Sequence, residues 1–297
     1  MRSDAATLPA AAARTRTRDF VALAKPRLNM LVVASTLAGY AMGDGESLGL
    51  VRLCGLLLGT GLVAGGASAF NQVIEREPDA LMRRTRTRPL PGQRLQPLEG
   101  LLFGSAITLA GVLLIVASSN LLAGAVALAT LVTYVAIYTP LKRRTSFGTV
   151  IGAIPGALPP VIGWAAVAGE LPLKAWILFG IVFLWQLPHF LAIAWMYRDD
   201  YARAGFPMLP VIEPDGRSTG RQSVIYAAAL VPLSLAPTLL HMAGPVYFAG
   251  ALALGIGFLW LTVRFARTRG VKDARNVFFG SIAYLPVLWI LMIADKL

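Results

Sequence analysis

The chain has 297 residues and a mean hydropathy of +0.65, and only 14% of its residues are charged. A soluble domain usually carries about 25% charged residues, so the composition excludes an ordinary soluble protein. A net charge of +12 could suggest a nucleic-acid partner. We reject that partner because the basic residues lie in short segments between apolar runs, as in membrane loops. One cysteine and two histidines exclude a disulfide framework and a histidine-rich metal centre.

Residues 1–24 form a basic, acid-poor segment, which we predict to be a disordered cytoplasmic tail. It lacks a long apolar core, which argues against a cleaved secretory signal. The rest of the chain, residues 25–297, is predicted to be one all-α, polytopic membrane domain. Nine apolar runs are expected to be helices, because backbone groups in lipid must be satisfied within the protein. These runs cover 28–43, 48–70, 99–118, 120–139, 147–168, 173–194, 223–242, 245–264 and 276–295.

The basic residues orient this arrangement. If the N-terminus is cytoplasmic, all of the 27 lysines and arginines fall in inner segments except Arg52, Lys174 and Lys296. Short basic loops stay on the cytoplasmic side, so we predict a cytoplasmic N-terminus and a C-terminus on the opposite side. Long polar loops are expected at roughly 71–98 and 195–222, which places the functional face in the cytoplasm.

The first long loop contains the strongest candidate site. Asn71, Glu75 and Asp79 are four residues apart and would share one helix face, where their oxygens suit Mg²⁺. Pro78 should bend or end that helix. Six arginines flank the three and suit phosphate oxygens, namely Arg76, Arg83, Arg84, Arg86, Arg88 and Arg94. The segment predicts a diphosphate site at a membrane surface; the alternative is a topology-setting loop with internal ion pairs.

Two other segments at inner ends could complete that site. Asp199 and Asp200 follow the sixth run and could add metal ligands, or could form only local ion pairs. Lys142 follows the fourth run and could reach a phosphate, while Tyr138 could face a developing carbocation. A lysine in this position is also an ordinary topology anchor.

A fourth candidate lies inside the sixth run, in Trp185-Gln-Leu-Pro188-His189-Phe190. Polar groups within a membrane span are functional candidates, so His189 could be a ligand or an acid–base group for a substrate. The alternative is a hydrogen bond to backbone freed by Pro188. The fifth run contains several prolines and glycines, so it must bend and could line a cavity.

Together these motifs resemble the UbiA superfamily of intramembrane prenyltransferases, and within it the branch that farnesylates protohaem IX. The matching pieces run almost end to end and are highly specific. They are Lys25-Pro26-Arg27, Asn71-x-x-x-Glu75-x-x-x-Asp79, Tyr138-Thr139-x-x-Lys142-Arg143, Pro188-His189-Phe190 and Asp200-Tyr201-x-x-Ala204-Gly205-x-Pro207-Met208-Leu209-Pro210.

The resemblance implies nine helices around a central cavity and a Mg²⁺-dependent reaction. Farnesyl diphosphate, haem B and water would give haem O and diphosphate. The candidate catalytic residues are Asn71, Glu75, Asp79, Tyr138, Lys142 and Asp200, and the candidate metal ligands are Asn71, Glu75, Asp79, Asp199 and Asp200. Diphosphate would be held by Arg76, Arg84, Arg88, Lys142 and Arg143. Haem would contact Trp185, His189 and Tyr197.

Two departures from the family pattern leave the number of metal ions open. Position 75 is Glu where the superfamily usually has Asp, so this ligand reaches one methylene further. The second acidic motif of relatives that prenylate aromatic acids is D-x-x-x-D, whereas the residue four after Asp200 is Ala204.

The expected location is a bacterial inner membrane, with the lipid bilayer, farnesyl diphosphate and haem B as partners. A haem A synthase or a terminal oxidase would receive the product, and no nucleic acid is expected. One alternative is the same chemistry on a quinone precursor or a chlorophyll-like acceptor. Another is a small-molecule transporter, but its acids should lie at the membrane midplane, whereas these gather at one face.

Overall fold

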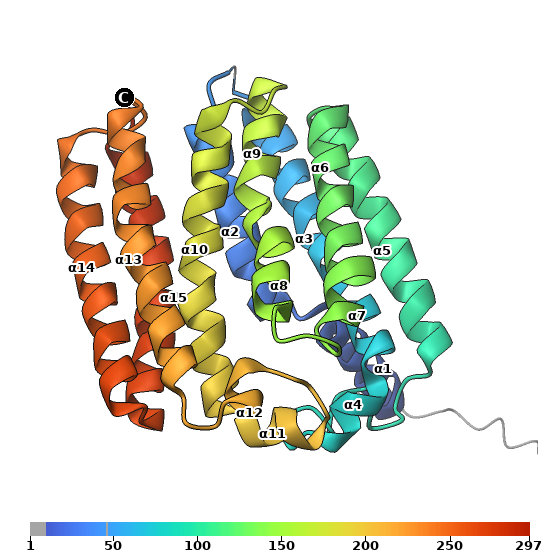
Figure 1. Ribbon diagram of the computed structural model, residues 1–297. Coiled ribbons are helices and arrows are strands. Elements are labelled where there is room, and N and C mark those ends of the chain that lie inside the picture. Colours follow the sequence, from blue (N-terminus) through green and yellow to red (C-terminus); the bar gives the residue numbers. More distant parts are fainter. Residues whose placement is uncertain (1–9, 46) are drawn as a thin grey trace, which may run out of the picture.

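A computed structural model describes residues 10–45 and 47–297, with side chains from Arg16 onward. Regular structure in these residues is helical, apart from one isolated bridge between Ala243 and Lys296. Figure 1 shows the long helices standing side by side. The short helices α4 (Arg76–Leu81), α11 (Arg198–Arg203) and α12 (Leu209–Ile212) gather at one end of this bundle, which we call the loop end.

Over the described ranges, nine helical segments are long and apolar enough to cross a membrane, in agreement with the nine predicted runs. The first joins α1 to α2, the fourth joins α6 to η1 and α7, and the fifth joins α8 to α9. The bounds are α1 Ala10–Ala24, α2 Pro26–Met42, α3 Gly49–Ile74, α5 Pro97–Ser118, α6 Leu121–Val132, η1 Thr133–Tyr138, α7 Thr139–Leu141, α8 Gly148–Ala157, α9 Pro159–Ala168, α10 Leu173–Met196, α13 Arg217–Leu239, α14 Pro245–Thr268 and α15 Val271–Ala294.

The prediction of a disordered tail is wrong from Ala10 onward, and residues 1–9 lie outside the described part of the chain. Helix α1 packs against α3 and α5, and its Leu23 is fully buried. The Arg94 Nε–H donates a bifurcated hydrogen bond to the two carboxylate oxygens of Asp19, at 2.9 and 3.1 Å. These distant contacts stabilise a helix that its basic composition alone does not predict.

The fifth membrane-spanning segment bends, as predicted. Pro159 and Pro160 start a new helix after Leu158, so α8 and α9 are separate pieces of one span. The backbones of α9 and α2 approach each other closely. A Cβ built on Gly39 would lie 1.8 Å from the Pro160 carbonyl oxygen, and one on Gly163 would lie 1.9 Å from that of Thr36. Small residues at such a contact permit the close approach.

This contact makes a testable prediction about stability. Gly163→Ala should destabilise the protein by about 1–3 kcal/mol, because the added methyl group overpacks the α2–α9 contact. The apparent melting temperature in detergent should fall by roughly 5 °C. Gly257→Ala is the matched control, since a Cβ on the exposed Gly257 of α14 meets nothing within 4 Å. Equal melting temperatures for the two variants would contradict the prediction.

Candidate functional site

The site begins where α3 ends. Pro78 cannot donate a hydrogen bond to the carbonyl of Ile74, so α3 stops at Ile74 and α4 begins after Glu75. The hydrogen-bond ladder continues through this break, because Glu75 N donates to Asn71 O (2.9 Å) and Asp79 N donates to Glu75 O (2.8 Å). Asn71, Glu75 and Asp79 are 3%, 3% and 1% exposed. Three oxygen-bearing side chains are therefore buried at the loop end of α3.

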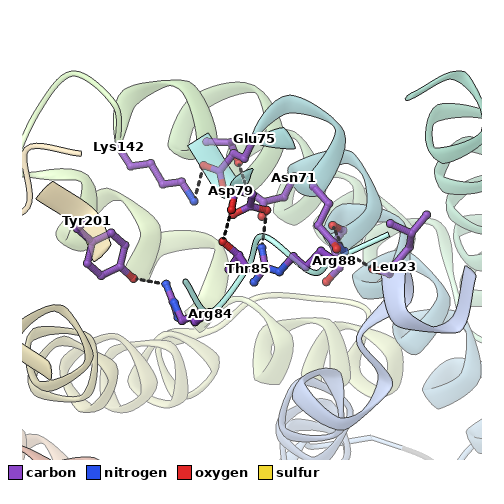
Figure 2. A network of polar contacts seen from close by, with 12 residues as sticks. Leu23, Asn71, Glu75, Asp79, Arg84, Thr85, Arg88, Lys142 and Tyr201 are labelled. Carbon is purple, nitrogen blue, oxygen red and sulfur yellow. Dashed lines mark hydrogen bonds and ion pairs between the residues drawn. The ribbon is translucent and has the colours of Figure 1, made fainter. Parts of the chain in front are cut away.

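A cation from another part of the chain lies against each of the two carboxylates. Lys142 Nζ is 2.6 Å from Glu75 Oε1, and Arg88 Nη1 donates to Asp79 Oδ2 across 2.6 Å (Figure 2). The Lys142 contact lacks the alignment of a hydrogen bond, so Glu75 Oε1 is a buried oxygen without a hydrogen-bond donor in the described chain. A buried charge without a partner is costly, and here each carboxylate has one cation beside it. The charges of the two pairs therefore cancel.

Asn71 is held by the irregular segment that follows α6. Residues 133–138 form a π-helix, a widened turn that occurs often at functional sites. Asn71 Nδ2 donates to Thr139 Oγ1 (3.2 Å), and the Thr139 hydroxyl donates to the Tyr134 carbonyl (2.9 Å). The amide nitrogen thus bonds to Thr139, and the amide oxygen takes no part in this hydrogen bond. Tyr134 has no role in the sequence prediction, although its four-residue spacing from Tyr138 was an available signal.

The two long loops meet over this cluster. The Arg84 guanidinium lies 4.9 Å from the Tyr197 ring centroid and 5.3 Å from that of Tyr201, whose hydroxyl it also binds (2.9 Å). Asp200 pairs with Arg203 and accepts a hydrogen bond from the Arg83 backbone N–H (3.2 Å). Beneath these contacts the two loops share an apolar cluster of Met82, Phe206 and Met208. We call this paired-loop layer the cap.

The structure separates the predicted metal ligands into two groups. Asn71, Glu75 and Asp79 lie together, whereas Asp200 belongs to the cap and Asp199 is exposed. No group of three acidic, histidine or cysteine side chains that could hold a metal occurs in the portion of the chain described. Two carboxylates and an amide are nonetheless a fitting donor set for Mg²⁺, which retains water and shares the oxygens of a bound phosphate.

The predicted phosphate ligands are also divided. Arg88 and Lys142 contact the carboxylates, Arg84 is in the cap, and Arg143 is exposed beside Lys142. Arg76 is not in the cluster, because it pairs with the exposed Glu77 (3.1 Å) and donates to the Val73 carbonyl (3.2 Å).

Lys25 is a further basic residue at the site, and the sequence interpretation gave it no role there. It lies close enough to Glu75, Asp79, Arg88 and Lys142 to interact with their charges. Its backbone is left-handed (φ 46°), which turns the chain sharply between α1 and α2. Such a conformation is unusual for lysine and is not evident from the sequence.

An apolar cavity of about 250 Å³ lies beside the charged cluster. It is lined by α2, α3, α6, η1, α8, α9 and α10. Tyr138 belongs both to its wall and to the charged cluster, since Lys142 Nζ lies 5.0 Å from the centre of the Tyr138 ring. An isoprenoid chain would suit the cavity, and a diphosphate attached to that chain would suit the buried ion pairs.

The three candidate haem contacts do not form one set. His189 stacks on Trp185 (5.5 Å between ring centroids) and on Phe278 of α15 (5.0 Å). Its Nδ1 is 2.7 Å from Ser281 Oγ. Trp185 is buried and donates its N–H to the Ser281 carbonyl (2.8 Å), whereas Tyr197 is in the cap against Arg84.

Residues 32–284 match the model of the UbiA prenyltransferase family. The chain belongs to this family. It is 49% identical to the protoheme IX farnesyltransferase of Solibacter usitatus (strain Ellin6076) over 288 residues, which cover 94% of this chain and 99% of the relative. It is 39% identical to the protoheme IX farnesyltransferase of Myxococcus xanthus (strain DK1622), over 100% of this chain and 99% of the relative.

A solved structure of a UbiA homologue from Archaeoglobus fulgidus, bound to GPP and Mg²⁺, has the same fold. Its TM-score is 0.65 at 16% identity, with 93% of this chain and 99% of that chain covered. These similarities confirm the predicted UbiA family, its protohaem branch and the nine-helix fold. The chain is therefore a multi-pass membrane prenyltransferase.

The contact between α1 and the first loop makes a testable prediction. Arg94 binds Asp19 and also donates to the carbonyl of Thr87, the residue before Arg88. Asp19→Asn should loosen this loop, because hydrogen bonds to charged groups are worth roughly 1.5–3 kcal/mol. Limited trypsin digestion should then cut between Arg83 and Arg94 roughly ten times faster than in the wild type.

The control for this prediction is Asp44→Asn. Asp44 forms an ion pair with Lys174 (2.7 Å) at the opposite end of the bundle, away from the loop. That variant should be cut at the wild-type rate. Unchanged digestion of Asp19→Asn would show that α1 does not hold the loop in place.

Proposed function

We propose that this protein transfers the farnesyl group of farnesyl diphosphate to a vinyl group of haem B. Water adds in the same reaction, and the products are haem O and diphosphate. The names of its relatives support the choice of donor and acceptor. The observation that carries the proposal is the position of two buried ion pairs, Glu75–Lys142 and Asp79–Arg88, beside an apolar cavity.

On the donor side, Arg88, Lys142 and Lys25 would bind the oxygens of the diphosphate. Arg84 and Arg143 are candidates for its outer edge, in the cap and beside Lys142. Asn71, Glu75 and Asp79 would hold Mg²⁺, which when bound neutralises the charge on the departing diphosphate. A UbiA homologue of the same fold binds GPP and Mg²⁺, which supports a site for a prenyl diphosphate together with Mg²⁺.

The ion pairs suggest how the site accepts a charged substrate. In the present structure Lys142 and Arg88 are partners of the carboxylates. When a diphosphate arrives, the two cations would turn to its oxygens and release Glu75 and Asp79 for the metal. Each buried charge would then have a partner both before and after binding, which avoids the cost of an isolated one.

The remaining chemistry needs shielding and does not need a nucleophilic side chain. Breaking the bond from carbon 1 to oxygen leaves an allylic cation, and Tyr138 and Tyr134 on the cavity wall present aromatic rings that favour it. The cap lies over the charged cluster and would limit access of water to this cation. The vinyl group of haem then bonds to carbon 1, and water adds to the resulting cation with loss of a proton.

His189 is proposed as an acceptor-side residue. The Ser281 hydroxyl has one hydrogen, which it donates to the Phe278 carbonyl (2.6 Å), so Ser281 Oγ accepts from His189 Nδ1–H. The unprotonated Nε2 would then be available to the haem iron, and a bond at the other ring nitrogen is the usual support for a ligating histidine. Trp185 would hold the His189 ring in place by stacking on it. Tyr197 would stabilise the cap through its contact with Arg84.

We further propose that the loop end is cytoplasmic and that the membrane is a bacterial inner membrane. Most basic residues lie in the segments at the loop end. The exceptions are Arg52 near the start of α3, Lys174 near the start of α10, and Lys296, which bonds to the end of α2. Water-soluble diphosphate and Mg²⁺ would enter from the cytoplasmic side, at the loop end. A haem A synthase or a terminal oxidase would take the product.

The carboxylates provide the first test. Glu75→Ala and Asp79→Ala should each lower haem O formation at least about 100-fold, because each removes a ligand that acts on the leaving group. Mass spectrometry of haems after incubation of purified protein with farnesyl diphosphate, haem B and Mg²⁺ would measure this loss. Glu77→Ala is the matched control, since Glu77 is exposed and outside the cluster, and should retain activity. Substantial haem O from both site variants would refute the proposal.

The histidine provides the second test. His189→Asn should bind haem B at least about tenfold more weakly, since it removes a ligand worth about 1.4 kcal/mol or more. The shift of the Soret band during titration of purified protein with haem would measure the affinity. His241→Asn is the control, because His241 is exposed and its left-handed backbone tolerates asparagine. Equal haem affinity in both variants would remove His189 from the site.

A further inference from the structure

We propose that Thr60, Ala127 and Ile162 form the floor of the apolar cavity and set the length of the isoprenoid tail that the protein accepts. This inference rests on the proposed function, because it takes the cavity as the site of the tail. It goes further by assigning a specificity role to three residues that are remote from the charged cluster.

The depth of the cavity follows from three separate helices. On α3 the lining residue furthest from Asn71 is Thr60, and on α6 the one furthest from Tyr138 is Ala127. On α8 and α9 the lining runs from Gly152 to Ile162. At 1.5 Å of rise per residue, the distance along α3 is about 16–17 Å. The distances along α6–η1 and α8–α9 are somewhat shorter than an unbroken α-helix would give, because one includes the π-helical turn and the other the break at Leu158. The lining of these helices thus ends at a similar depth.

This depth matches one length of isoprenoid. With carbon–carbon bonds of about 1.5 Å, the main chain of an extended farnesyl group spans roughly 14 Å. A geranyl group is one isoprene unit shorter and would leave an empty space above the floor. A geranylgeranyl group is one unit longer and would collide with the floor. The walls suit such a tail because small residues, including Ala64, Ala67 and Gly156, line the space between mouth and floor.

The floor is solid and apolar in character. Ala127 is fully buried, and Thr60 and Ile162 are each 2% exposed. Ala127 and Ile162 belong to one packed cluster, which continues beyond the cavity through Leu56 and Ile115. Thr60 donates its hydroxyl to the Leu56 carbonyl (2.9 Å), so no unpaired polar group faces the end of the tail. The tail therefore meets packed side chains that cannot easily yield.

A competition experiment tests this assignment. Purified protein receives haem B, Mg²⁺ and equal amounts of geranyl, farnesyl and geranylgeranyl diphosphate, and mass spectrometry gives the ratio of the prenylated haems. The wild type should make mainly the farnesyl product. Ala127→Leu raises the floor and should shift the geranyl-to-farnesyl ratio at least roughly tenfold toward geranyl. Ile162→Ala lowers the floor and should shift the geranylgeranyl-to-farnesyl ratio by a similar factor toward geranylgeranyl.

The control for the enlarged side chain is Ala125→Leu, the same change on an exposed face of α6. It should leave the product ratios unchanged. If Ala127→Leu does not fold, as judged by its melting curve, Ile162→Ala decides the matter because it removes atoms. Wild-type product ratios in the folded floor variants would overturn the inference while leaving the proposed function intact. No prenylated haem from the wild type would instead refute the proposed function.

Discussion

The structure depends on the burial of two carboxylates, Glu75 and Asp79, at the end of a membrane helix. Charges in that position require partners, and the partners come from distant parts of the chain. Lys142 approaches from the end of the fourth span, and Arg88 from the first loop. These ion pairs therefore connect the loop end of the bundle and place cations and acids at the cavity together.

The surrounding fold serves to hold these partners in place. Asp19 on α1 binds Arg94 and thereby anchors the loop that carries Arg88. The cap joins that loop to the second one through Arg84 and the rings of Tyr197 and Tyr201. Close glycine contacts between α2 and α9 bring together two of the cavity walls. On the proposed function, the charged cluster and the apolar cavity are two parts of one site, which would take the head and the tail of one substrate.

Much of this architecture follows from local sequence patterns. Apolar runs near 20 residues predict the spans, and the bias of lysine and arginine predicts which loops share one end. The four-residue spacing of Asn71, Glu75 and Asp79 predicts their common face, and that spacing survives the break at Pro78 because the backbone hydrogen bonds continue. These properties depend on neighbours in the sequence.

The features that sequence reasoning missed depend on contacts between distant residues. Helix α1 has a basic composition that suggests disorder, yet it packs against α3 and α5, and its Asp19 binds Arg94, 75 positions away. Arg84, a candidate phosphate ligand, also binds Tyr201, 117 positions away, and this contact has no signal in the sequence. The left-handed turn at Lys25 has no local signal. Haem selection is the hardest part to derive, because aromatic packing around His189 resembles ordinary core packing.

The proposed function depends most on one event, in which the cations and the carboxylates exchange partners when substrate binds. Calorimetric titration of the protein with Mg²⁺ alone, farnesyl thiodiphosphate alone and the two premixed would test this claim. The premixed pair should bind at least roughly tenfold more tightly than either ligand alone, and the double variant Glu75→Gln, Asp79→Asn should lose that gain. Binding of Mg²⁺ alone as tightly as the premixed pair would contradict the account.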